Sequence, residues 1–156
     1  MMAALWSDVD AEIASAVKHF DRGVKLFRSD RFAPGVVADY YDEMAFLHAM
    51  QCGFTSFESA LKRMFALLAE ELPRGRDSHA ALLQRAARPL TGLRPAVLDE
   101  ALFNASDELR RFRHVAIHTY DFLDKDRAAL TVKAAEVFLA NIGPALARFR
   151  AVIDPD

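Results

Sequence analysis

The sequence has few of the residues that cross-link a chain or build a metal or nucleotide site. Its single cysteine, Cys52, excludes an internal disulfide and the common cysteine-based zinc frameworks. Its six glycines form no Gly-rich phosphate loop, which argues against a P-loop nucleotide site. No Glu-x-x-His segment occurs, so a carboxylate-bridged metal centre is not expected. The sequence therefore predicts a protein without a cofactor or a resident metal.

A long apolar run and a marked net charge are also missing. Asp8, Asp10 and Glu12 lie within the first turns, so neither a signal peptide nor a membrane-spanning segment is expected. The net charge is only −2, so the surface as a whole is not that of a nucleic-acid-binding protein. A length of 156 residues, 53% of them hydrophobic, is enough to bury a core. We expect a single domain over residues 1–156 in a cytoplasmic protein without a membrane partner.

Positive charge is concentrated in the middle third of the chain. Between Pro73 and Pro95 there are five arginines and one acidic residue, Asp77; the arginines are Arg74, Arg76, Arg85, Arg88 and Arg94. Three more arginines follow within residues 110–113. Such a cluster can attract a polyanion. The alternative interpretation is a set of scattered, solvated arginines.

The apolar residues recur at helical spacing throughout, without strand-like alternation. Five helices are predicted, over residues 7–28, 36–72, 78–87, 96–118 and 126–153. Ser78 is a suitable N-cap for the short third helix. Pro144 should kink the last helix without ending it, because apolar spacing resumes after it. The pattern predicts an all-α fold, an antiparallel bundle of four main helices plus one short helix.

One stripe of the predicted second helix carries polar residues among apolar ones. Six of its eight members are apolar; the set is Met44, Leu47, Gln51, Phe54, Glu58, Leu61, Phe65 and Leu68. A carboxylate in such a stripe is costly unless it meets a cation or several hydrogen-bond donors. We expect Glu58 to pair with Arg110 or Arg113 of the predicted fourth helix. In the alternative, Glu58 points to water.

Residues 110–120 bring together three guanidiniums, two imidazoles and a phenol. Arginine is a permanent bidentate ligand for phosphate, and histidine transfers protons near neutral pH. Cleavage of RNA through its own 2′-hydroxyl requires such a pair and no metal. We expect Arg113 to bind the scissile phosphate and His118 to act as general acid or base, supported by His114, Glu58 and Arg110.

Two histidines of this segment also have a spacing that can hold zinc. His114 and His118 are four residues apart and share a helix face, but the flanking arginines would repel a cation and no third ligand is evident. The other three histidines, His19, His48 and His79, are interpreted as structural residues.

Helical geometry separates the two expected catalytic residues. Five steps of about 100° place Arg113 and His118 roughly 140° apart around a regular helix. Either the helix ends near His118, so that the chain turns back toward Arg113, or two chains contribute to a shared cleft. Arg110, His114 and His118 are successive i, i+4 neighbours that could form a basic ridge.

Arg113, His118 and Tyr120 spell R-x4-H-x-Y, which resembles the signature of the HepT toxins in the HEPN superfamily of helical ribonucleases. Phe112-Arg113-His114-Val115 and residues 71–75, 78–79 and 82–83 also look HepT-like, so the likeness extends from about Phe54 to Phe149. The segment before His79 departs from the expected pattern because it lacks a bulky aromatic residue.

The resemblance implies a toxin of a type VII-like toxin–antitoxin pair. HepT proteins are helical homodimers whose two motifs face a shared cleft, where RNA is the substrate. The partner is a minimal nucleotidyltransferase antitoxin, which transfers AMP to the motif tyrosine, here Tyr120, and silences the ribonuclease. A non-catalytic helical module that binds a nucleotidyltransferase, a nucleotide or both remains the alternative.

Overall fold

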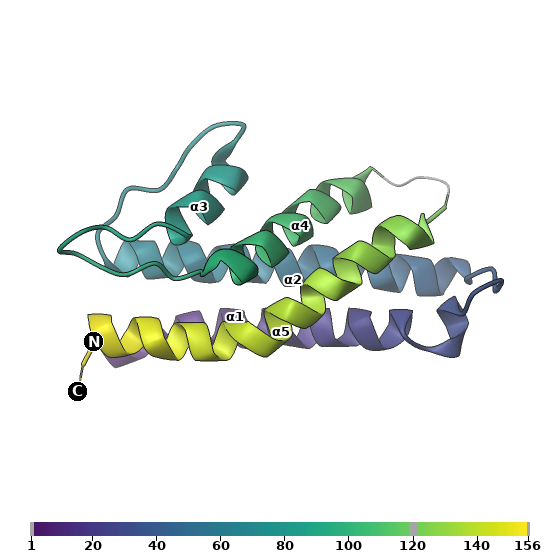
Figure 1. Ribbon diagram of the computed structural model, residues 1–156, viewed down its shortest axis with the longest axis horizontal. Coiled ribbons are helices and arrows are strands. Elements are labelled where there is room, and N and C mark those ends of the chain that lie inside the picture. The colour runs from purple at the N-terminus through teal and green to yellow at the C-terminus, as the bar shows by residue number, and fades with distance from the viewer. Residues whose placement is uncertain (1, 119–121, 156) are drawn as a thin grey trace.

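The computed structural model describes residues 2–118 and 122–155. Over these residues the chain is helical and forms no β-strand; the elements are α1 (Met2–Phe27), the 3-10 helix η1 (Asp30–Phe32), α2 (Tyr40–Leu67), α3 (Ser78–Ala86), α4 (Glu100–Ile117) and α5 (Lys125–Ile153). The four long helices alternate in direction, and α3 is the short one (Figure 1). The predicted all-α bundle is confirmed.

The core lies where the four long helices meet. Helix α1 packs along α2 and α5, α4 packs on α2 and α5, and α3 packs against α2 and α4 (Figure 1). Fully buried phenylalanines fill the interior, with the Phe138 ring centroid 4.9 Å from that of Phe57 and 5.1 Å from that of Phe20. Phe46 and Phe112 join α2 to α4 at 5.8 Å. Burial of these large rings makes a large contribution to the hydrophobic stabilisation.

Helix α2 is shorter at both ends than the predicted range of 36–72. It begins at Tyr40 because the Asp39 carboxylate accepts a hydrogen bond from the Tyr41 amide at 3.0 Å. It ends at Leu67 because Ala69 adopts a left-handed conformation with φ of 55°. The Glu70 amide then donates to the Phe65 carbonyl at 2.9 Å, which is the hydrogen bond of a Schellman C-cap. This cap usually contains glycine, so the sequence did not signal it.

The other helix boundaries differ by smaller amounts. Helix α1 begins at Met2 rather than residue 7. Helix α4 begins at Glu100 rather than residue 96, because the Asp99 side chain caps the Leu102 amide at 2.8 Å. Ser78 is not the N-cap of α3; Asp77 occupies that position, without a side-chain cap hydrogen bond. Helix α5 continues through Pro144 and changes direction partway along its length, as expected of a kinked helix (Figure 1).

Helix α5 is long and apolar enough, by these two criteria alone, to cross a membrane. Its most apolar window has a mean hydropathy of 1.2, and 44% of that window is buried inside the protein. The core helix of a soluble protein meets the same criteria. Its buried residues pack against α1 and α4 in the interior described above. The expected lack of a membrane-spanning segment stays a prediction.

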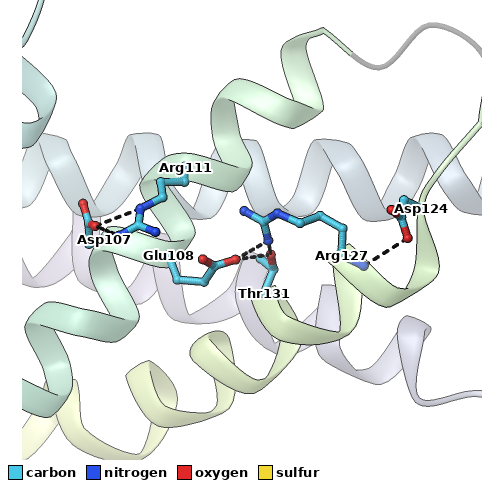
Figure 2. A network of polar contacts seen from close by, with 6 residues as sticks. All are labelled: Asp107, Glu108, Arg111, Asp124, Arg127 and Thr131. Atoms are coloured by element: carbon cyan, nitrogen blue, oxygen red, sulfur yellow. Dashed lines mark hydrogen bonds and ion pairs between the residues drawn. The ribbon is translucent and has the colours of Figure 1, made fainter.

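A polar network fixes α4 to the first turns of α5 (Figure 2). The Asp124 carboxylate caps α5 by accepting a hydrogen bond from the Arg127 amide at 3.1 Å. The Arg127 guanidinium donates to Glu108 and, at 3.0 Å, to the buried Thr131 hydroxyl, which in turn donates to Glu108 at 3.1 Å. The guanidinium carbon also lies 5.5 Å from the Phe112 ring centroid. These contacts hold the half of α4 that carries the arginine and histidine motif.

Candidate functional site

Glu58 is buried, as predicted, but its predicted partners are wrong. The residue is only 7% exposed on the inner side of α2. Its Oε2 atom accepts a hydrogen bond from Nδ1 of His79 on α3, and its Oε1 atom accepts one from Lys62 Nζ at 3.2 Å. Helix α3 lies over this part of α2 and brings His79, rather than Arg110 or Arg113, to the carboxylate.

Arg110 is instead held by its own helix. Its Nε atom donates to Asp107 Oδ1 at 2.8 Å. Arg111 donates to Asp107 Oδ2 at 2.6 Å (Figure 2). Burial alone would raise the pKa of Asp107, but the hydrogen bonds and the positive charges of Arg110 and Arg111 outweigh it and lower that pKa. Asp107 therefore stays ionised and fixes the direction of two arginines. Asp107 is not among the site residues predicted from the sequence, although its i, i+3 and i, i+4 spacings signal the pairs.

Arg113 differs from its neighbours Arg110 and Arg111, which both bind Asp107, because it has no partner in the part of the chain that the structure describes. Within residues 2–118 and 122–155 its guanidinium makes no hydrogen bond or ion pair, and its Nε atom is buried without an acceptor. An unpaired buried donor of this kind costs on the order of 1–3 kcal/mol. Arg94 and Arg127, by contrast, each bind a carboxylate. The free guanidinium is therefore suited to an acceptor supplied by another molecule.

A pocket of about 250 Å³ opens between the start of α3 and the last turns of α4. It is lined by Arg76, Asp77, His79, Ala80, Arg110, Arg113, His114 and Ile117. Three guanidiniums face one carboxylate in this lining, and two imidazoles complete it. The arrangement favours an anion over a cation, and arginine in such a setting binds phosphate.

His118 lies at the end of α4, as one of the two geometric alternatives requires. It is the C-cap residue, and its amide donates to the His114 carbonyl at 3.3 Å. Its exposed imidazole lies 4.4 Å from that of His114, centroid to centroid, so the predicted basic ridge continues from the pocket to the helix end. His118 is not among the described residues that line the Arg113 pocket. Tyr120 lies outside the described residues.

One arginine of the predicted basic cluster belongs to the interior. The Arg94 side chain is 1% exposed and donates to both carboxylate oxygens of Glu70 and to three backbone carbonyls. Arg74, Arg76 and Arg88 are exposed, so the cluster divides into a structural residue and surface residues. In the part of the chain that the structure describes, no group of three or more His, Cys, Asp or Glu side chains is placed to hold a metal ion.

Sequence reasoning also missed His79 and Arg76 as members of the site. His79 was interpreted as a structural histidine, yet it contacts the buried Glu58 and lines the Arg113 pocket. A signal was present, because a carboxylate in an apolar stripe requires a donor from another helix. Position 79 also lies in one of the segments that resemble the HepT toxins.

The fold and the pocket define a helical bundle of the HEPN type, with an arginine and histidine motif at the end of its penultimate helix. The chain matches the family described as HepT-like protein over residues 45–153, which is more than half of its length. It therefore belongs to the HepT-like family. The matched range contains most of α2 and all of α3 and α4, and therefore the whole described pocket. No curated protein and no solved structure matches the chain.

Proposed function

We propose that this chain is the toxin of a two-gene, type VII-like toxin–antitoxin pair and acts as a metal-independent endoribonuclease. Its membership of the HepT-like family supports the toxin assignment. The observation that carries the activity is the unpaired Arg113 guanidinium in a pocket that also contains two imidazoles. This combination suits a phosphodiester that must be both bound and deprotonated at a neighbouring hydroxyl.

In the proposed reaction the RNA supplies its own nucleophile. The 2′-oxygen forms a bond to phosphorus, the bond from phosphorus to the 5′-oxygen breaks, and the 2′-hydroxyl proton passes to a base while an acid protonates the 5′-oxygen. The products are a 2′,3′-cyclic phosphate and a 5′-hydroxyl. Arg113 binds the phosphate and neutralises the charge that develops on it. His118 is one of the two proton-transfer groups.

We further propose that the active species is a homodimer. In one chain, Arg113 lines the pocket while His118 lies beyond it at the helix end. A two-fold axis near the end of α4 would place both motifs in one cleft and give each phosphate more cationic groups. Light scattering at micromolar concentration should therefore report twice the monomer mass of 17.4 kDa. A monomer under these conditions contradicts this part of the proposal.

The proposed partner is a minimal nucleotidyltransferase that transfers AMP to Tyr120. An adenylyl group on this phenol would be a bulky anion next to the motif and would compete with RNA for Arg113. The protein and its antitoxin would then meet in the cytoplasm. Intact mass measured with and without the partner gene should differ by whole AMP units, and Tyr120→Phe should abolish the difference while retaining cleavage.

A second candidate function is binding without catalysis. The separation of Arg113 and His118 in one chain favours it, because binding at Arg113 does not require His118 nearby. A non-catalytic module could use the same pocket to hold a nucleotide phosphate or the nucleotidyltransferase. It would bind without breaking a bond. Both candidates predict anion binding at Arg113, and only the first predicts a cleaved product.

The experiment that separates them uses the full chain, a labelled single-stranded RNA and the DNA of the same sequence. We expect cleavage of RNA only, in the presence of EDTA. His118→Ala should lower the rate by about 10²–10⁴-fold. Arg113→Lys should also lose activity because the bidentate fork is lost, whereas the control Arg148→Lys, at an exposed arginine of α5, should not. Unchanged cleavage in His118→Ala, or equal cleavage of DNA, would overturn the ribonuclease assignment.

A further inference from the structure

The His79 and Glu58 side chains have the geometry of an oriented base. His79 Nδ1 is hydrogen-bonded to Glu58 Oε2. A carboxylate has no proton to donate, so Nδ1 must carry the hydrogen of this bond. The other ring nitrogen, Nε2, then has a free lone pair whenever the ring is neutral. A carboxylate that fixes the tautomer and direction of an imidazole is the arrangement that makes histidine an effective base in nucleophilic catalysis.

The carboxylate of this pair is itself held in place. Lys62 Nζ binds the second oxygen of Glu58 at 3.2 Å, so both oxygens have partners. The Glu58 side chain is 9% exposed, which prevents water from replacing the His79 contact. The His79 side chain is 42% exposed, so one edge of the ring contacts the buried carboxylate and the rest is accessible. An imidazole used only for packing would not need both a buried carboxylate on one edge and an accessible opposite edge.

The accessible part of His79 lies in the same pocket as the free arginine. His79, Arg113 and His114 all line it, whereas His118 lies beyond it. Two helices therefore contribute to the pocket, with the oriented histidine on α3 and the phosphate ligand on α4. Asp107 does not compete for Arg113, because it binds Arg110 and Arg111. A phosphate at Arg113 would bring an adjoining ribose toward α3.

We propose that His79 is the general base of the RNA cleavage and that Glu58 is its positioning residue. The inference rests on the proposed ribonuclease function and names the proton acceptor that it requires. His79 Nε2 takes the 2′-hydroxyl proton as the 2′-oxygen bonds to phosphorus. The electron pair of the breaking bond passes to the 5′-oxygen, which takes a proton from the imidazolium of His118. Charge and protons balance without any further reactant.

The test compares variants at His79 and Glu58 by their kcat and KM values for a single-stranded RNA. His79→Ala and His79→Gln should each lower kcat by about 10²–10⁴-fold with little change in KM. Added imidazole should restore part of the His79→Ala activity, because the small base can occupy the space left in the pocket. Glu58→Gln should lower kcat by about tenfold or more without changing KM, and imidazole should not rescue it.

The matched control is His48→Ala, an exposed histidine of α2 that lies next to Cys52 and the His19 ring and does not line the Arg113 pocket. Its kcat and KM should equal those of the wild type, and circular dichroism should confirm that all variants are folded. If wild type cleaves and His118→Ala does not, but His79→Ala stays active, the inference is wrong and the ribonuclease function stands. Activity lost in His79→Ala through KM alone, or without imidazole rescue, also overturns it. If the wild-type protein does not cleave RNA, both the ribonuclease function and the role of His79 as general base are wrong.

Discussion

Replacement of Arg94 by alanine should destabilise the whole protein and release α3. Arg94 contacts the end of α2 through Glu70 and the end of α3 through the carbonyls of Arg85 and Arg88. Its guanidinium carbon also lies 5.0 Å from the Phe65 ring centroid. One side chain thus joins the segments that bracket α3, on which His79 and Arg76 depend.

The expected magnitude follows from what the alanine leaves behind. The Glu70 side chain is only 12% exposed, so its carboxylate would become a buried charge without a partner. Removal of one member of a buried ion pair costs about 3–5 kcal/mol. At roughly 2–4 °C per kcal/mol for a chain of this length, the melting temperature should fall by on the order of 10 °C. A total stability of about 5–15 kcal/mol allows the variant to remain folded at room temperature.

Urea unfolding followed by circular dichroism measures this free energy directly. Arg94→Lys should recover only part of the loss, because one ammonium group cannot reach both Glu70 oxygens and the carbonyls at once. The double variant Arg94→Met with Glu70→Leu should be more stable than Arg94→Ala, since it leaves no buried charge. An exposed salt bridge contributes up to about 1 kcal/mol. If the free energy of unfolding of Arg94→Ala lies within that amount of the wild-type value, then Arg94 does not hold α3 in place.

Two further substitutions test local features. Ala69→Gly should raise the free energy of unfolding by about 0.5–1 kcal/mol, because glycine relieves the left-handed strain at φ of 55°; an unchanged or lower urea midpoint would contradict the Schellman cap. Asp107→Asn should cost about 0.5–1 kcal/mol at pH 7. The pKa of Asp107 in the folded protein is lowered from its ordinary value of 3.8. This stabilisation is therefore fully present above pH 3.8 and is lost as the pH falls through the folded-state pKa. The melting temperatures of the wild type and Asp107→Asn should therefore converge at low pH. A difference that stays constant with pH would refute the ion-pair account.

The helices were predictable from sequence because apolar periodicity is a local signal. Their ends were less predictable, because they depend on backbone conformations and contacts that apolar periodicity does not report. Ala69 takes the left-handed position that glycine usually occupies, and nothing in the sequence marks it. Val97 and Leu98 were assigned to a helix, but their amides instead bind the Ala86 carbonyl at 2.8 and 3.1 Å and cover the end of α3. A periodic pattern cannot distinguish such a non-helical segment from a first helical turn.

The site was predictable on α4 and not on α3, for a physical reason. Arg110, Arg113 and His114 belong to one helix, so their spacing alone places them near one another. The contact between Glu58 and His79 depends on where α3 lies, and that is set by the left-handed turn at Ala69 and by buried Arg94. The sequence identified a carboxylate that needed a partner. The predicted partners came from α4, which has the most arginines, whereas the observed partner His79 lies on α3, which the preceding loop brings close to Glu58.

Arg94 and Arg113 show how burial and hydrogen bonding together separate structure from function. Both come from the arginine-rich part of the chain, and both have buried guanidinium nitrogen atoms. Arg94 has an acceptor for each nitrogen, so its burial stabilises the fold. Arg113 has none within the described residues, so the cost of its desolvation is not offset by internal contacts. A chain selected for stability alone would gain from losing that guanidinium, so its presence beside the Glu58 and His79 pair supports the phosphate-binding role that we propose for it.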